Sequence, residues 1–260
     1  MRRRLDLELV RRGLASSRSE GRDAILAGRV LVGGSVAGKP GSLVAPADPV
    51  TVRGASRPYA SRAGEKVAAA LDRFGVDPAE RWCLDAGAST GGFTDVLLRR
   101  GAAHVVALDV GYGQLAWGLR EDPRVTVMER FNVRGLRPEH LARSPQLIVA
   151  DLSFISLRLA IAPLVGVAAD RADLIVLVKP QFEAGRREVG RGGVVSDPSV
   201  WARAIEAVAE ACRRAGAGPL EAMPSPVRGP KGNVEFPLHA RVGEPGVVLD
   251  AAAVVREVAA

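Results

Sequence analysis

Apolar positions follow two different patterns along the chain, and the change between them divides the sequence into a short first part and a longer second part. In the first 52 residues the spacing predicts two short helices and a small cluster of strands. Leu5, Leu9 and Val10 repeat at helical spacing, and Gly13 is suited to end that helix. This first part is typical of a small α+β domain.

A second helix is predicted to run from Ser17, as its N-cap, to about Ala27. Glu20, three residues after Ser17, completes a capping box, and Gly28 is suited to stop the helix. Short apolar segments follow, with a two-glycine turn between the first two of them. The expected strands are 30–32, 35–37, 43–44 and 50–52.

The second part begins after a segment of turn-forming residues. Residues 53–60 contain Gly54 and Pro58 and are predicted to form a linker. A helix is then expected from Ser61, as its N-cap, to about Phe74, because apolar residues recur on one of its faces.

From residue 81 onward, apolar strands alternate with helices across Gly or Asp turns. This alternation is typical of a parallel sheet with helices on both faces. The expected strands are 82–86, 104–109, 125–129, 147–151, 174–179, 220–223 and 233–241, and the expected helices are 92–99, 115–119, 138–142, 157–164 and 198–215. We therefore expect a doubly wound, mostly parallel α/β domain behind the small α+β domain.

Charge is unevenly distributed between the two parts. Residues 1–57 hold eleven basic and five acidic side chains, a net charge of +6, whereas the whole chain carries +7. A concentrated basic surface of this kind suits a polyphosphate partner such as a nucleic acid. The alternative is an arginine-rich surface that only contacts solvent.

Several classes of protein are not expected from this composition. No stretch approaches the roughly 18 apolar residues of a membrane span, and acidic residues follow Met1–Arg4 where a signal peptide would be apolar. Cys83 and Cys212 lie far apart, and the three histidines have no metal-binding spacing. We expect a cytoplasmic protein without a disulfide or a metal.

A glycine-rich loop follows the first strand of the sheet, at residues 85–94 (DAGASTGGFT). It lacks the G-x-G-x-x-G of dinucleotide-binding loops and the Gly-Lys-Ser/Thr of P-loops. Its D-x-G-x-x-x-G-G form resembles the first motif of class I (Rossmann-like) methyltransferases, which implies S-adenosylmethionine as cofactor. NAD or a structural turn remains the alternative.

The resemblance assigns roles to residues in and near this loop. Asp85 would meet the methionyl ammonium, and Asp109, at the end of the second strand, would accept the ribose hydroxyls. Asn132 would approach the adenine, with a turn role as its alternative. The expected cofactor-binding residues are Asp85, Gly87, Ser89, Thr90, Gly91, Gly92, Phe93, Asp109, Val110 and Asn132.

Four charged residues are candidates for catalysis. Methylation of a ribose hydroxyl requires removal of its proton, and a neutral lysine can accept that proton. Asp151 and Lys179 end two strands of the predicted sheet, where α/β sheets bind ligands, while Lys66 precedes the sheet and Glu235 lies in its last strand. Their order resembles the Lys–Asp–Lys–Glu set of FtsJ-type 2′-O-methyltransferases, although each could instead form a structural ion pair.

The segments around these residues are similar to one family in particular. They are 85–94, 109–115 (DVGYGQL), 151–157 (DLSFISL), 179–183 (KPQFE) and 232–235 (GNVE). The first part of the chain resembles the RNA-binding module first described in ribosomal protein S-four. Together they resemble the TlyA family, called haemolysins in places.

This resemblance implies cytidine 2′-O-methylation of ribosomal RNA, with Lys179 as general base and Asp151 paired with it. Lys66 and Glu235 would complete the network that orients the ribose. It also implies an RNA-binding domain at 1–56, a linker at 57–61 and an FtsJ-like methyltransferase domain at 62–260, acting as a monomer on rRNA or ribosomal subunits. The expected RNA-binding residues are Arg4, Arg18, Arg22, Lys39 and Arg62.

The chain departs from the family pattern at a few positions. Gly21 stands where the RNA-binding module usually has Ala, and Gly33 where it usually has Asn or Asp. In the linker region, Ala60 and Ala63 replace the usual Val and Gly. The two glycines would loosen the fold of the module slightly without removing a charge, and the two alanines bear on how the two domains are coupled.

Three other functions remain open from the sequence. The first is a non-catalytic RNA-binding or ribosome-assembly factor that kept only the fold. The second is a membrane-active haemolysin, as the family's other name suggests. The third is a base methyltransferase, since the cofactor loop is common to both kinds of enzyme.

Overall fold

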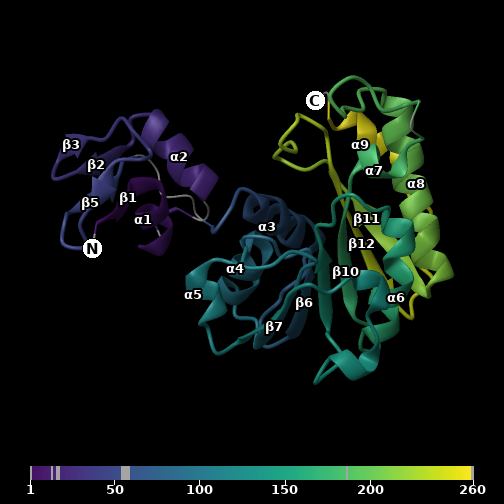
Figure 1. The fold of residues 1–260 in the computed structure, drawn as a ribbon. Coiled ribbons are helices and arrows are strands. Elements are labelled where there is room, and N and C mark those ends of the chain that lie inside the picture. Colours follow the sequence, from purple (N-terminus) through teal and green to yellow (C-terminus); the bar gives the residue numbers. More distant parts are fainter. Residues whose placement is uncertain (1, 13, 16–17, 54–58, 186, 259–260) are drawn as a thin grey trace.

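The computed structural model describes residues 2–12, 14–15, 18–53, 59–185 and 187–258. The chain forms two parts, a small N-terminal one and a larger one built on a single sheet (Figure 1). The predicted roles of Gly13 and Ser17, and most of the predicted linker, lie outside the described residues. The domain boundaries at 56 and 61 stay a prediction.

The N-terminal part packs two helices against short strands. Helix α1 (Leu5–Arg11) and helix α2 (Arg18–Leu26) match the two expected helices. Strand β2 (Val30–Val32) lies between β3 (Ser35–Val36) and β5 (Val50–Val52) in an antiparallel sheet. Strand β1 (Arg3–Arg4), which the sequence did not predict, pairs with β4 (Leu43–Val44). The core of this part is Leu5, Leu9, Ala15, Ala24, Ile25, Val30, Val44 and Val50.

The larger part is a seven-stranded sheet in the order β11-β12-β10-β9-β6-β7-β8. Five neighbouring strands are parallel, and β12 runs antiparallel to both β10 and β11. The strands are β6 (Trp82–Ala86), β7 (His104–Leu108), β8 (Val125–Met128), β9 (Leu147–Ala150), β10 (Asp173–Val178), β11 (Ala217–Ala222) and β12 (Phe236–Val242). The expected doubly wound, mostly parallel sheet is confirmed.

Helices cover both faces of this sheet (Figure 1). Helices α3 (Ala63–Phe74) and α4 (Gly92–Arg99) bury one apolar cluster against it. Helices α6 (Ile161–Val167) and α8 (Pro198–Arg214) bury the larger cluster on the other face, beside α9 (Ala251–Arg256), which the sequence did not predict. The described shorter helices are α5 (Trp117–Arg120), α7 (Pro180–Glu183), η1 (Val133–Gly135), η2 (Pro138–His140) and η3 (Leu157–Leu159).

The helix expected over 157–164 is interrupted. The 3-10 turn η3 begins after Ser156, whose side chain accepts a hydrogen bond from the Arg158 amide. Helix α6 then starts anew at Ile161. Pro163 explains the break, because its nitrogen carries no hydrogen to donate to the carbonyl of Leu159, as a continuous helix would require.

Strand direction gathers polar residues at one edge of the sheet. The chain switches direction across the sheet between β6 and β9, so the loops that leave these strands diverge there. Strand β12 is antiparallel, and its first residue, Phe236, pairs with the last residue of β10, Val178. Residues that follow β6, β9 and β10 therefore share an edge with residues that precede β12.

No described helix is long and apolar enough to cross a membrane. Likewise, the residues that the structure describes contain no group of three or more His, Cys, Asp or Glu side chains that could hold a metal ion.

A buried charge cluster occupies the opposite edge of the sheet. Asp173, at the start of β10, is 3% exposed and binds Arg81 at 2.7 Å, His239 at 2.8 Å and Arg241 at 2.9 Å. Burial alone would raise the pKa of Asp173, but the hydrogen bonds from His239, Arg81 and Arg241 outweigh it and hold the pKa well below its usual range.

Replacing Asp173 with alanine should leave the side chains of Arg81, His239 and Arg241 without their shared partner and lower the free energy of unfolding by about 2–4 kcal/mol at pH 7. The pKa of Asp173 is depressed in the folded state, so its contribution is present above the unfolded pKa of about 3.9 and lost as pH falls below it. Urea unfolding at several pH values measures this. Asp170→Ala, at an exposed residue of the preceding turn, is the control, and an equal loss in both variants would contradict the assignment.

Candidate active site

A pocket of about 300 Å³ lies at the edge of the sheet where the polar residues gather. Its walls come from the start of α3, the glycine-rich loop after β6, the ends of β9 and β10, and the segment before β12. The lining residues are Ser61, Arg62, Ala63, Lys66, Gly87, Ala88, Ser89, Thr90, Gly92, Phe93, Asp151, Ser153, Lys179, Val227, Arg228, Pro230 and Glu235.

The four charged candidates form two ion pairs in this pocket. Lys179 Nζ lies 2.5 Å from Asp151 Oδ1, and Lys66 Nζ lies 2.5 Å from Glu235 Oε2. Lys66, Lys179 and Glu235 are all buried. The structure thus brings together all four residues, which the sequence separates by up to 169 positions.

The two pairs differ in geometry. Lys66 donates a hydrogen bond to Glu235. Lys179 instead donates its hydrogen bond to Ser153 Oγ, at 2.9 Å, while Asp151 Oδ1 accepts no hydrogen bond within the described residues. Asp151 therefore acts on Lys179 by its charge, and Ser153, which sequence reasoning did not single out, fixes one of the N–H directions of the amine.

The glycine-rich loop packs directly against the end of β9. Gly87 has a φ of +91°, and a Cβ atom on it would lie 2.5 Å from the backbone oxygen of Asp151. The missing side chain therefore lets the glycine-rich loop approach the strand end that carries Asp151.

Asp85 presents an unsatisfied oxygen beneath this loop. It is fully buried, and its Oδ2 accepts hydrogen bonds from the amide and the hydroxyl of Thr94, at 2.9 and 2.6 Å. Its Oδ1 has no hydrogen-bond partner among the described residues. Burial, more than the nearby charges of Asp151 and Asp109, raises the pKa of Asp85 to about 7.

This arrangement fits S-adenosylmethionine. A cationic amino group beside Oδ1 would satisfy the orphaned oxygen and favour the ionised carboxylate. Among the predicted cofactor residues, Gly87, Ser89, Thr90, Gly92 and Phe93 line the pocket, and Gly91 caps helix α4, which begins beside them.

The remaining cofactor candidates, Asp85 among them, do not line the pocket. Asp109 accepts hydrogen bonds from the amides of Ser89, at 2.8 Å, and Gly111, at 2.6 Å, which ties the second strand to the glycine-rich loop. Val110 is 73% exposed. Asn132 uses its side-chain oxygen to cap η1, accepting from the Arg134 amide, so the turn role that we considered for it is present in the structure.

A buried carboxylate that the sequence analysis missed holds the loop after β9. Glu183 of α7 accepts hydrogen bonds from the hydroxyl of Ser156, at 2.6 Å, and from the amide of Leu157, at 2.7 Å. Arg158 approaches the same carboxylate from solvent. The loop so anchored carries Ser153, the partner of Lys179. Because these contacts span 25 or more residues, sequence spacing gave no signal for them.

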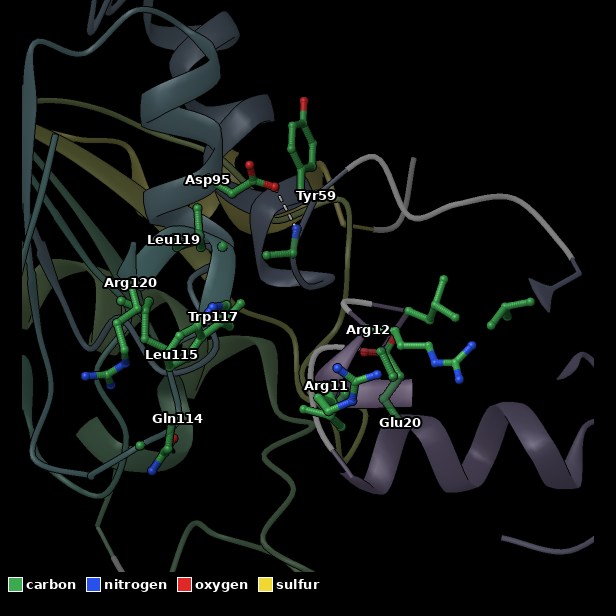
Figure 2. A pocket seen from close by; sticks show the side chains of 18 of the residues that line it. Arg11, Arg12, Glu20, Tyr59, Asp95, Gln114, Leu115, Trp117, Leu119 and Arg120 are labelled. Atoms are coloured by element: carbon green, nitrogen blue, oxygen red, sulfur yellow. Dashed lines mark hydrogen bonds between the residues drawn. The ribbon is translucent and has the colours of Figure 1, made fainter. Parts of the chain in front are cut away.

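The segment that enters α3 is attached to the helix that leaves the glycine-rich loop. The amide of Ala60 donates to Asp95 Oδ2 at 2.8 Å, and Arg99 binds the other oxygen of that carboxylate. Figure 2 shows this contact beside the ring of Tyr59.

The five predicted RNA-binding residues lie in three different surroundings. Arg4 and Arg18 both bind the buried carboxylate of Asp6, and hydrogen bonds from Arg4 and then from Arg18 lower the pKa of Asp6 to about 2. Arg22 and Lys39 are exposed on the N-terminal part, and Arg62 lines the pocket.

A larger cleft of about 1070 Å³ separates the N-terminal part from the sheet domain. Arg11, Arg12 and Glu20 face it from one side, and Trp117 and Arg120 face it from the other (Figure 2). Trp117 is 68% exposed. None of these residues was a candidate binding residue from the sequence, because their proximity depends on how the two parts of the chain meet.

Known families match both parts of the chain. The family model of FtsJ-like methyltransferases matches residues 59–242, and that of the S4 domain matches residues 3–50.

Three relatives are similar to nearly the whole chain. The 16S/23S rRNA (cytidine-2′-O)-methyltransferase TlyA of Mycobacterium tuberculosis is 53% identical, over 92% of this chain and 90% of that protein. Hemolysin A of Brachyspira hyodysenteriae is 39% identical, over 91% of this chain and 98% of that protein. A solved structure of a provisionally named hemolysin from Streptococcus thermophilus has a TM-score of 0.78 at 35% identity, covering 98% of this chain and 95% of that one.

The anchoring role of Glu183 can be tested by mutation. Glu183→Ala should release the loop that holds Ser153 beside Lys179, and turnover in a methyl-transfer assay should fall about tenfold to a hundredfold. Glu183→Gln, which keeps an acceptor oxygen, should recover part of the loss. Arg158→Ala removes only the solvent-side contact and serves as the control. Wild-type turnover in Glu183→Ala would rule the role out.

Proposed function

The chain belongs to the TlyA family of FtsJ-like methyltransferases, and we propose that it methylates the 2′-hydroxyl of cytidine in ribosomal RNA with S-adenosylmethionine as methyl donor. One observation carries this proposal: two lysine–carboxylate pairs line the same small pocket as the glycine-rich loop. Methylation of a base nitrogen does not require such a set. The relative from Mycobacterium tuberculosis, named for cytidine 2′-O-methylation, supports the choice of acceptor.

Lys179 is the general base in this proposal. Its Nζ is buried and donates one N–H to Ser153, and an amine in its neutral form has a lone pair for the substrate. As the hydroxyl O–H bond breaks, the proton forms an N–H bond on Nζ. Asp151, 2.5 Å away, stabilises the ammonium so formed.

Lys66 and Glu235 orient the substrate. Their mutual ion pair is buried and joins α3 to the residue that precedes β12. When bound, S-adenosylmethionine supplies an electrophilic methyl group. Asp85 would hold its amino group and Asp109 its ribose, with Val110 and Asn132 beside the adenine.

RNA capture belongs to the N-terminal part in this proposal. That part holds most of the excess positive charge of the chain and matches an S4 domain. Arg4, Arg18, Arg22 and Lys39 are its proposed phosphate contacts. The partner is rRNA within or outside a ribosomal subunit, which places the protein in the cytoplasm, and the proposed active form is a monomer.

Lys179→Ala should reduce methyl transfer to rRNA by at least about a hundredfold, because the variant loses the amine that takes the proton. The assay uses labelled S-adenosylmethionine and ribosomal subunits from cells that lack the gene, followed by mapping of 2′-O-methyl groups. Affinity for the cofactor and for the subunits should stay near wild type. Retained turnover in Lys179→Ala would show that Lys179 is not the general base.

Cofactor binding should weaken as pH falls from about 7 to about 5.5. The pKa of Asp85 is raised to about 7, so the carboxyl becomes neutral below that pH and no longer attracts the methionyl ammonium. The dissociation constant should rise by up to about tenfold per pH unit. Calorimetry with Asp85→Asn, expected to bind weakly at every pH, checks the origin of the effect. A wild-type dissociation constant that does not change with pH would contradict this origin. If the protein were a non-catalytic RNA binder, titration with S-adenosylmethionine would show no heat.

A further inference from the structure

We propose that Arg228 and Arg62 bind the phosphodiester group next to the ribose that is methylated. This inference rests on the proposed function and names the group of the substrate that these two residues contact. Arg62 was expected from the sequence to bind RNA, whereas Arg228 was not a candidate.

The argument begins with the charge balance of the pocket. Of its lining residues, Lys66 and Lys179 are matched by Glu235 and Asp151. Arg62 and Arg228 also line it, and no acidic residue among the described ones pairs with either. The pocket walls therefore carry two positive charges that lack an acidic partner in the part of the chain that the structure describes.

The guanidinium of Arg228 is largely available to a ligand. Its side chain is exposed and makes one long hydrogen bond, from Nη1 to the backbone oxygen of Gly232 at 3.4 Å. Arg62, at the N-cap of α3, is exposed as well, and its side chain makes no hydrogen bond within the described residues. Most of the N–H groups of both side chains are free to donate.

The backbone around Arg228 is fixed against the catalytic pair. Ser225 donates its amide to the backbone oxygen of Glu235 at 2.8 Å, and Gly229 donates to that of Asn233 at 2.9 Å. A Cβ atom on Gly229 would lie 2.5 Å from Oε1 of Glu235, so only glycine allows this approach. The loop therefore presents Arg228 at a defined position relative to the Lys66–Glu235 pair.

The substrate supplies an anion that matches these charges. In RNA the 2′-hydroxyl lies on the carbon next to the one that carries the 3′-phosphate, so a hydroxyl brought to Lys179 brings a phosphodiester into the same pocket. An anion that leaves water needs charged donors, and guanidinium groups form paired hydrogen bonds with phosphate oxygens.

The carboxylate of S-adenosylmethionine is a second possible anion for the same arginines. The proposal commits to the RNA phosphodiester, because both arginines stand beside the lysine pairs and neither belongs to the glycine-rich loop. The two sources are separated by measuring binding of each ligand alone.

The test uses the full-length protein with Arg228→Ala, Arg228→Lys and, as control, Lys231→Ala. Lys231 is an exposed cation of the same loop that does not line the pocket. Filter binding measures the dissociation constant for unmethylated ribosomal subunits at several salt concentrations, calorimetry measures that for S-adenosylmethionine, and a methyl-transfer assay gives turnover.

Arg228→Ala should weaken subunit binding about tenfold or more and lower the slope of log affinity against log salt by about one. Arg228→Lys should keep the salt slope and recover part of the affinity. Cofactor affinity should stay unchanged in both, and Lys231→Ala should behave as wild type. Unchanged thermal unfolding of the arginine variants establishes that the fold is intact.

Three results would overturn the inference. If Arg228→Ala keeps the wild-type subunit affinity and salt slope, Arg228 does not contact a phosphate. Weakened cofactor binding with unchanged subunit binding would assign Arg228 to the cofactor carboxylate. An equal loss of subunit affinity in Lys231→Ala would mean that Arg228 acts only through the general positive charge of the loop. Failure of the wild-type protein to methylate rRNA would instead overturn the proposed function and the premise of the inference with it.

Discussion

The active site depends on the antiparallel register between β10 and β12. Because Phe236 pairs with Val178, the residue before β12 and the residue after β10 meet at one edge of the sheet. Those residues are Glu235 and Lys179, and each is paired with a partner from a different part of the chain. A one-residue shift of β12 in this register would turn the side chain of Glu235 away from the pocket.

Close backbone packing then joins the glycine-rich loop to the four charged candidates. Gly87 lies against the backbone of Asp151, and Gly229 lies against the carboxylate of Glu235. At both positions a side chain would push a loop away from one of the two ion pairs. The buried charges need this tight enclosure, because an ion pair in a low-dielectric site is useful only when its geometry is held.

The sequence predicted the sheet well because its buried strands are short apolar runs ended by Asp, Gly or Lys. Strand β6 and helix α4 were predicted to the residue, and Asp151 and Lys179 were placed at the correct strand ends. It could not predict Glu183 or Arg228, whose roles arise from contacts between distant segments. Helix α9 was missed, since nothing in its short apolar sequence separates it from a loop.

The net charge of the N-terminal part was counted correctly from the sequence. The count did not reveal how its acidic and basic side chains pair. Asp6 and Glu8 are buried and together bind Arg4, Arg18, Arg11 and Arg12. The guanidinium-bearing side chains of Arg4 and Arg18 still remain 44% and 59% exposed. The two acids therefore do more than cancel charge: they hold flexible side chains in one orientation, which reduces the entropy lost when those side chains bind an anion.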